Sequence, residues 1–233
     1  MNLCVIPARG GSKRIPRKNI KPFNGLPMIA YSIESALESG CFDKVVVSTD
    51  DVEIAAVAKS YGAEIPFMRP KTLSNDKAGT LPVIKHAVEW FDKCFQPPEY
   101  VCCLYATAPF VQSQNIRNAL TQLIKTQAEY CFTVTSYSFP IQRAIRLTEK
   151  NRIEMFEPQN FNMRSQDLEA AYHDAGQFYW GMAETFKRQK IFFSEIATPF
   201  VLPRYQVQDI DTPEDWTQAE MMYQVLQQSG KIK

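Results

Sequence analysis

Short apolar runs alternate with helical patterns over the first seventy residues of this 233-residue chain. Leu3–Pro7, Lys44–Ser48 and Ala63–Met68 have the composition of buried strands. Between them, the segments that follow Pro27 and span Val52–Tyr61 carry apolar residues at helical spacing. Strands that alternate with helices in this way pair in parallel through right-handed crossovers. The alternation therefore predicts an α/β protein with a doubly wound sheet.

The rest of the chain continues this pattern, with one interruption. Further strands are predicted at Tyr100–Tyr105, Tyr130–Thr135, Phe178–Trp180 and Ile191–Phe193, and further helices at Thr80–Cys94, Gln114–Lys125 and Glu214–Gln228. Between residues 137 and 172 prolines, charges and scattered aromatic residues replace the regular periodicity. This segment is predicted to leave the sheet.

The composition restricts the kind of ligand. The 26 Lys and Arg residues nearly balance the 25 Asp and Glu residues, which argues against a general nucleic-acid binder. No stretch approaches the roughly 20 apolar residues of a membrane span, and the opening lacks the charge order of a signal peptide. The six cysteines form no CxxC pair. We expect free thiols in a cytoplasmic protein that contacts no membrane.

A basic loop follows the first predicted strand. Two glycines and five cations lie within residues 9–19, directly after Ala8. Glycines let backbone N–H groups approach an anion closely, and arginine and lysine supply opposite charge. The loop is therefore predicted to bind a polyphosphate, although it lacks the GxxxxGK[ST] spacing of the P-loop. The alternative is a solvated basic turn.

A pair of carboxylates precedes the last predicted helix. In an extended segment Asp209 and Asp211 point to the same face, so they are candidate ligands for Mg²⁺ beside nucleotide phosphates. The alternative makes Asp211 only a helix cap. Asp50 and Asp51 are similarly explained by capping of the helix that begins at Val52. No Ser-His-Asp or Cys-His arrangement stands out, which disfavours covalent nucleophilic catalysis.

The sequence IPARGGSKRIPRKN resembles the N-terminal signature of the CMP-nonulosonic acid synthetases, the cytidylyltransferases that activate sialic acid and related sugars with CTP. The resemblance continues through Arg69-Pro70 with Leu73, Asp76 and Thr80, and through Tyr100–Pro109, Gly176–Tyr179, Phe192-Phe193 and Asp209–Thr212. It implies a Rossmann-like doubly wound mixed sheet formed by residues 1–136 and 173–233. It also implies a dimerisation arm at residues 137–172, and hence a homodimer.

The resemblance further implies the roles of individual residues. CTP would be bound by Ala8, Arg9, Gly10, Gly11, Lys18, Asn19, Arg69 and Thr80, with Arg9, Lys18 and Asp211 acting in catalysis. Mg²⁺ would be held by Asp209 and Asp211. The sugar would be contacted by Tyr105, Thr107, Arg164, His173, Asp174, Gln177, Tyr179, Phe192 and Phe193. The implied reaction transfers CMP from CTP to the anomeric 2-hydroxyl of a nonulosonic acid and releases pyrophosphate.

Two departures bear on the sugar. Sialic acid synthetases commonly have a glutamine where this chain has Tyr105, and their NGAIY strand is here Ala175–Tyr179. The combination YATAPF with AYHDAGQFYWG is most similar to the family branch that activates pseudaminic acid. An aromatic ring with one hydroxyl suits a deoxygenated, methyl-terminated sugar. Activation of N-acetylneuraminate, legionaminate or KDO, and a non-catalytic nucleotide-binding module, remain the alternatives.

Overall fold

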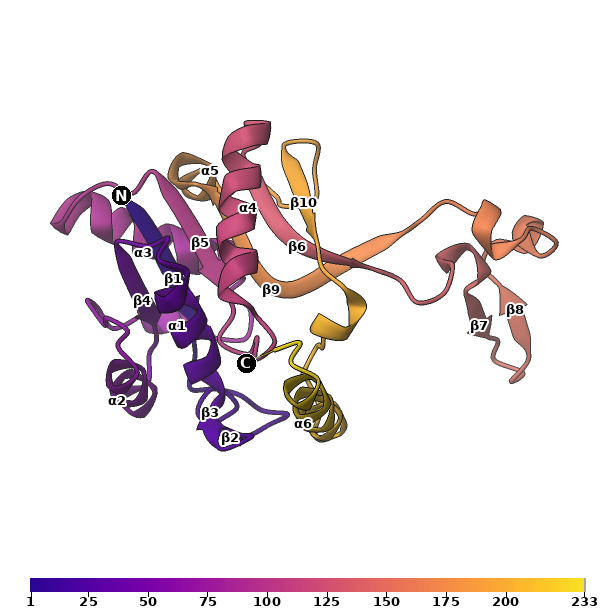
Figure 1. The fold of residues 1–233 in the computed structure, drawn as a ribbon, viewed down its shortest axis with the longest axis horizontal. Coiled ribbons are helices and arrows are strands. Elements are labelled where there is room, and N and C mark those ends of the chain that lie inside the picture. Colours follow the sequence, from indigo (N-terminus) through magenta and orange to yellow (C-terminus); the bar gives the residue numbers. More distant parts are fainter. Residues whose placement is uncertain (233) are drawn as a thin grey trace.

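The computed structural model describes residues 1–232 and contains a six-stranded mixed sheet in the order β10-β6-β9-β5-β1-β4 (Figure 1). Five strands are parallel, and β9 runs antiparallel to its neighbours β5 and β6. The strands are β1 (Asn2–Pro7), β4 (Lys44–Ser48), β5 (Tyr100–Leu104), β6 (Tyr130–Ser136), β9 (Tyr172–Met182) and β10 (Ala197–Val201). The prediction of a doubly wound mixed sheet is confirmed.

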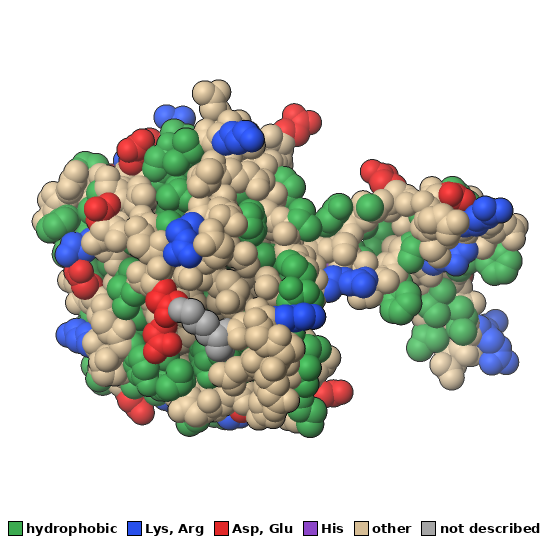
Figure 2. Space-filling model, in the orientation of Figure 1, with side chains coloured by type: hydrophobic (Ala, Val, Ile, Leu, Met, Phe, Trp, Pro, Cys, Tyr) green, Lys and Arg blue, Asp and Glu red, His purple; other side chains and the backbone are tan. Residues whose placement is uncertain are grey.

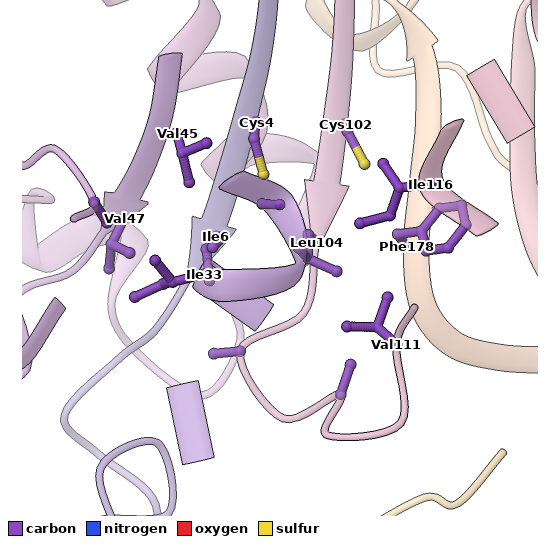
Figure 3. Packing of buried hydrophobic residues seen from close by; sticks show 14 of the residues in the cluster. Cys4, Ile6, Ile33, Val45, Val47, Cys102, Leu104, Val111, Ile116 and Phe178 are labelled. Atoms are coloured by element: carbon purple, nitrogen blue, oxygen red, sulfur yellow. The ribbon is translucent and has the colours of Figure 1, made fainter. Parts of the chain in front are cut away.

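Helices cover both faces of this sheet. They are α1 (Met28–Ser39), α2 (Val52–Ser60), α3 (Thr80–Cys94), α4 (Ser113–Thr126), α5 (Ala183–Lys187) and α6 (Pro213–Gln228). Alternate side chains of β1 point to opposite faces, so Cys4 and Ile6 pack with α1, α2 and α4, whereas Leu3 and Val5 pack with α3 and α5. Figure 3 shows the first of these cores, in which β1, β4 and β5 meet α1.

The C-terminal helix packs on a third core beside the short hairpin β2 (Pro22–Phe23) and β3 (Leu26–Pro27). Phe23 is fully buried there, with edge-on ring contacts to Tyr31, Trp216 and Tyr223 at centroid distances of 5.5–5.6 Å. Thr212 begins α6 with a capping box, in which it and Asp215 exchange hydrogen bonds. The end of the chain is thus held against the basic N-terminal loop.

Two predicted strands are wrong. In the segment 63–68 only Glu64 forms a bridge, to Val46, because Pro66 lacks an N–H for further pairing. Residues 191–193 form no strand; Phe192 instead packs on Tyr130 and Tyr179. β10 forms one edge of the sheet, with β4 at the other, and tolerates Pro199 because an edge strand has unpaired positions.

Residues 137–171, here called the arm, project from the end of β6 and β9 (Figure 1). The arm contains the hairpin β7 (Ile145–Leu147) and β8 (Ile153–Met155), together with the single 3₁₀ turns Ile141–Arg143, Pro158–Asn160 and Ser165–Asp167. Two further 3₁₀ turns lie in the main body at Lys71–Leu73 and Arg204–Gln206. The space-filling view shows apolar side chains gathered on the arm (Figure 2).

Over residues 1–232, none of the helices combines the length and the hydrophobicity needed to cross a bilayer. The six cysteines are free thiols, and four of them are buried within the strands. Burial raises the pKa of Cys4, Cys102, Cys103 and Cys131, which keeps these thiols protonated and unreactive.

Gly181 in β9 tests the packing of the second core. A Cβ atom at this position would overlap the ring of Tyr130, which is fully buried, packs on Phe186 and donates its hydroxyl to the Lys190 carbonyl oxygen at 3.1 Å. Because this ring cannot move aside, Gly181→Ala should lower the free energy of unfolding by about 2 kcal/mol. The measurement is urea denaturation followed by circular dichroism.

The matched control is Gly11→Ala, since a Cβ atom at Gly11 meets open space. The control should keep the wild-type unfolding midpoint. Equal unfolding midpoints for Gly181→Ala and wild type would contradict the tight packing of Gly181 against the Tyr130 ring.

Candidate functional site

The basic loop begins where β1 ends, at the carboxyl edge of the sheet. Ala8 is buried and its N–H donates to the Ser48 carbonyl oxygen at 2.9 Å, which keeps β1 and β4 together up to the turn. The Asn19 side-chain amide closes the loop by donating to the Arg9 carbonyl oxygen at 2.9 Å. Ile15 anchors the middle of the loop in the third core. The carboxyl edge is where open α/β sheets bind ligands.

Asp50 and Asp51 fasten this loop to the sheet. Asp51 accepts from the N–H groups of Glu53 and Ile54 as the cap of α2, and Arg17 donates to it at 2.5 Å. The Arg17 guanidinium, together with these helix N–H groups, lowers the pKa of Asp51 to about 2. The Gly10 N–H donates to Asp50 at 3.1 Å. Capping thus accounts for Asp51, which also orders the loop.

Gly10 is required by this close approach. A Cβ atom at Gly10 would lie 2.7 Å from the Asp51 carboxylate, whereas one at Gly11 would meet nothing within 4 Å. The two glycines therefore differ. Gly10 permits the loop to lie against Asp51 at the start of α2, whereas a side chain at Gly11 would meet open space.

A cavity of about 420 Å³ lies over the loop, lined by Arg9, Ser12, Lys13, Arg14, Lys18 and Asn19 among others. Its acidic residues bind the cations that surround them. Asp76 accepts from Arg9 at 2.7 Å and from Lys13 at 2.5 Å. Both cations hold the pKa of Asp76 below its usual range. This basic cavity has the charge to hold a polyphosphate, because the single charge of Asp76 is shared between two of its cations.

The carboxylate segment near the C-terminus reaches the same cavity. The Lys18 ammonium donates to the Ile210 carbonyl oxygen at 2.6 Å and lies 3.3 Å from the Asp211 carboxylate. Arg14 donates to the other oxygen of Asp211 at 2.6 Å. The structure therefore brings together the two ends of the chain that the sequence singled out.

A second cavity, of about 550 Å³, adjoins the first, and Thr107 lines both. Its walls include Tyr105, Asp174, Tyr179 and Asp209. The Tyr179 hydroxyl donates to Asp174, and the hydroxyls of Tyr105 and Thr80 lie 2.9 Å apart. Burial raises the pKa of Tyr105 to about 12, so its phenol stays neutral and presents a hydroxyl and a ring.

Several predicted sugar contacts also lie near this second cavity. His173 lines it, with Nδ1 2.9 Å from the Asp174 carbonyl oxygen and its ring 4.8 Å from that of Tyr137, where the arm begins. Phe192 packs on the ring of Tyr179, which lines the cavity. Phe193 is largely exposed and contacts Phe132. These residues form and support one wall.

Four predicted sugar contacts line neither cavity of this chain: Phe192 and Phe193, described above, and also Arg164 and Gln177. Arg164 lies in the arm, immediately before the turn Ser165–Asp167. Gln177 is 3% exposed and donates its amide to the Gln206 carbonyl oxygen at 2.5 Å. The positions of Arg164 and Gln177 could not be foreseen from sequence alone, because each depends on where a distant segment packs.

Arg69 is buried beside the basic loop. It is 6% exposed, its Nη2 lies 3.7 Å from Asp50, and its Nε and Nη2 have no hydrogen-bond partner among the described residues. Burial lowers the pKa of this guanidinium. A buried cation with free N–H groups favours an anionic or carbonyl-bearing ligand.

The chemistry of Asp209 and Asp211 fits a divalent cation. Desolvation and the neighbouring Asp211 raise the pKa of Asp209, although Lys18 and Arg14 act in the opposite direction. A carboxylate with too little positive charge around it is a suitable ligand for Mg²⁺. Over residues 1–232, no group of three His, Cys, Asp or Glu side chains could hold a metal alone. The remaining ligands would be phosphate oxygens and water.

The sequence is similar to known proteins over almost its whole length. The cytidylyltransferase family profile matches residues 3–228. A pseudaminic acid cytidylyltransferase of Campylobacter jejuni is 48% identical over 229 residues, which cover 98% of this chain and 99% of that protein. A CMP-N,N'-diacetyllegionaminic acid synthase of Legionella pneumophila is 32% identical and covers 97% of this chain and 98% of that protein.

The fold is also found among solved structures. A CMP:2-keto-3-deoxy-manno-octonic acid synthetase complexed with CTP matches with a TM-score of 0.68 at 18% identity, covering 97% of this chain and 99% of that one. At this identity the likeness concerns the fold alone. The family profile and the near-full-length relatives establish that the chain belongs to the cytidylyltransferase family, enzymes that transfer a nucleotidyl group from CTP.

Proposed function

We propose that this protein transfers CMP from CTP to the anomeric 2-hydroxyl of pseudaminic acid and releases pyrophosphate. The observation that carries the proposal is the pair of adjoining cavities that share Thr107. One is basic and suits a triphosphate. The other is lined by hydroxyls, aromatic rings and the three carboxylates of Asp174, Asp209 and Asp215, which suits a sugar with hydroxyl groups to donate. Two relatives that are 48% identical to this chain are named pseudaminic acid cytidylyltransferases.

In this reaction the sugar hydroxyl oxygen forms a bond to the α-phosphorus while the bond from that phosphorus to the bridging oxygen of pyrophosphate breaks. The protein's contribution is mainly positioning and charge stabilisation. Arg9 and Lys18 would neutralise the leaving pyrophosphate, together with the backbone N–H of Gly11. The Gly10 N–H, which was expected to join them, donates to Asp50 instead. Asn19, which lines the basic cavity, and the buried Arg69 would contact the nucleoside, together with Ala8 and Thr80.

Asp209 and Asp211 would hold Mg²⁺, which when bound supplies positive charge to the phosphate oxygens and favours ionisation of the attacking hydroxyl. Binding of CTP requires the cations that pair with Asp211 and Asp76 in the free chain to turn toward phosphate. Arg14 and Lys13 lie on the loop and are largely exposed, so they can do so without repacking the core.

The second cavity favours a sugar with an apolar end. Tyr105 presents a ring and one neutral hydroxyl, bound to Thr80, in place of an amide that donates and accepts. Asp174 already accepts from the Tyr179 hydroxyl and, at 2.8 Å, from the Gly176 N–H. Few hydrogen-bond partners remain for a glycerol side chain, whereas a methyl terminus finds rings to pack on.

We further propose that the protein is a cytoplasmic homodimer whose arm meets a second copy. The arm exposes a set of large apolar side chains that includes Phe139, Ile145, Leu147, Ile153, Phe156 and Phe161. A patch of this kind marks an interaction surface. Among the described residues that line the second cavity there is no lysine or arginine. Arg164 on the arm would supply this missing cation to the carboxylate of a sugar bound in the second cavity of the partner subunit.

Removal of charge at the junction of the two chain ends should abolish most activity. Lys18→Ala and Asp211→Ala should each lower kcat for pyrophosphate release by roughly 10²–10³, because each removes a preorganised charge from the transition state. The control is Lys125→Ala on α4, outside both cavities. All three variants should keep the wild-type melting temperature. Near-normal release by Lys18→Ala or Asp211→Ala would refute the assigned role.

A sugar panel tests the substrate. With CTP and Mg²⁺, pseudaminic acid should give rapid pyrophosphate release, and N-acetylneuraminate, legionaminate and KDO should give little. Tyr105→Gln should lower kcat/KM for pseudaminic acid by about 10-fold or more, since the ring and hydroxyl that fit this sugar are lost. Pyrophosphate release with N-acetylneuraminate alone would refute the assignment to pseudaminic acid. No pyrophosphate release with any sugar would indicate a nucleotide-binding module.

The oligomeric state tests the arm. In sedimentation equilibrium the wild type should have twice the 26.7 kDa mass of one chain. Phe139→Asp places a charge on the patch at a side chain that is 82% exposed in one chain, and it should yield monomers. Lys150→Asp, at the tip of the β7–β8 hairpin, is the control and should remain dimeric. A monomeric wild type would contradict the proposal.

A further inference from the structure

Gln177 is a buried polar residue in the middle of β9. Its neighbours in the strand face the site: Gly176 lines the second cavity, as do Asp174 and Tyr179. The Gln177 side chain does not. Its Nε2 donates to the Gln206 carbonyl oxygen at 2.5 Å, while its Oε1 is buried and has no hydrogen-bond partner among the described residues. A buried amide whose oxygen makes no hydrogen bond lowers the stability of the fold. We therefore expect the hydrogen bond that its nitrogen makes to have a function.

Gln206 is held from a second direction as well. It is 9% exposed, and its side-chain oxygen accepts from Asn115 in α4 at 3.2 Å. Gln206 is the last residue of the 3₁₀ turn Arg204–Gln206. One amide from the sheet and one from a helix therefore fix the point where this turn ends.

The segment that follows Gln206 carries the carboxylates. Residues 207–211 belong to no helix or strand, and Val207, Gln208 and Asp209 line the second cavity. The next fixed point is Ile210, which is buried in the third core and accepts from Lys18 at 2.6 Å. Asp209 thus lies in a short irregular segment that is held at Gln206 on one side and at Ile210 on the other.

We infer that Gln177 is a positioning residue, which fixes Asp209 relative to the wall of the second cavity. This inference rests on the proposed function, in which Asp209 holds Mg²⁺. Gln177 sits between Asp174 and Tyr179 on one strand, so its amide ties the metal-binding segment to the strand that forms the sugar wall. Loss of the Gln206 anchor would leave Val207, Gln208 and Asp209 held only from Ile210, so the carboxylate of Asp209 would lose its fixed position.

The test uses hydrogen exchange of the full-length protein without nucleotide or metal. Gln177→Met keeps the length and volume of the side chain but removes the donor. Amides of residues 204–211 should exchange about 10-fold faster or more than in wild type, while amides of β5 exchange at the wild-type rate. Asn115→Leu, which removes the second anchor, should accelerate the same segment.

The matched control is Thr133→Val. Thr133 is fully buried on the adjacent strand β6 and bonds to Phe178, so its loss perturbs the sheet without touching Gln206. This variant should leave exchange of residues 204–211 unchanged. Equal exchange in wild type and Gln177→Met, or equal acceleration in Gln177→Met and Thr133→Val, would overturn the inference.

A second measurement connects the anchor to the metal. Mn²⁺ binding in the presence of CTP, followed by electron paramagnetic resonance, should weaken by about 10-fold or more in Gln177→Met. KM for CTP should change little, and Thr133→Val should bind Mn²⁺ as the wild type does. Unchanged Mn²⁺ affinity in Gln177→Met would overturn the link. A wild type without pyrophosphate release would refute the proposed function, whereas the exchange result stands by itself.

Discussion

The contact of Lys18 with the Ile210–Asp211 segment is the interaction on which the site depends. It joins residues 192 and 193 positions apart in the chain, through the Ile210 carbonyl oxygen and the Asp211 carboxylate. The Lys18 side chain is only 19% exposed, so its charge is poorly screened there. The third core holds both partners in place, since Ile15 from the basic loop and Ile210 from the carboxylate segment are buried in it. Without this closure the basic cavity would lack a wall.

Most of the fold could be predicted from periodicity, and the failures have local causes. Strands such as Lys44–Ser48 are short, β-branched and buried on both faces, which makes them recognisable. The segment after Gly62 has similar composition, yet Pro66, which has no N–H to donate, leaves it a single bridge from Glu64 to the edge strand β4. β10 was missed because Pro199 argues against a strand unless the strand lies at an edge. Edge position is set by the packing of the whole sheet, which local sequence does not contain.

The candidate site likewise has features that the sequence predicts and features that it does not. The position of Lys18 in the basic cavity could be predicted from its spacing after β1. The role of Gly10 could not, because it depends on the approach of Asp50 and Asp51 from another loop. The partners of these residues could not be predicted either. Asp76 was recognised only as part of a motif, although it binds both Arg9 and Lys13, because nothing in a sequence states which loop folds over which. The direction of the Gln177 side chain depends on the path of residues 203–209, which pass over the end of β9.

The antiparallel strand β9 unites these observations. It is the only strand of the described sheet that opposes the others, and it lies between β5 and β6, so the ligand-bearing ends of its neighbours meet its N-terminal half. Asp174 in that half and Tyr179 beyond the middle of the strand line the second cavity, and between them Gln177 donates to Gln206, which precedes the segment of Asp209. The same half continues with β6 into the arm. A displacement of the arm would therefore reach Asp174 and Gln177 through this one strand, because Tyr172–Asp174 pair with β6 alone, whereas Tyr179–Gly181 pair with both β5 and β6.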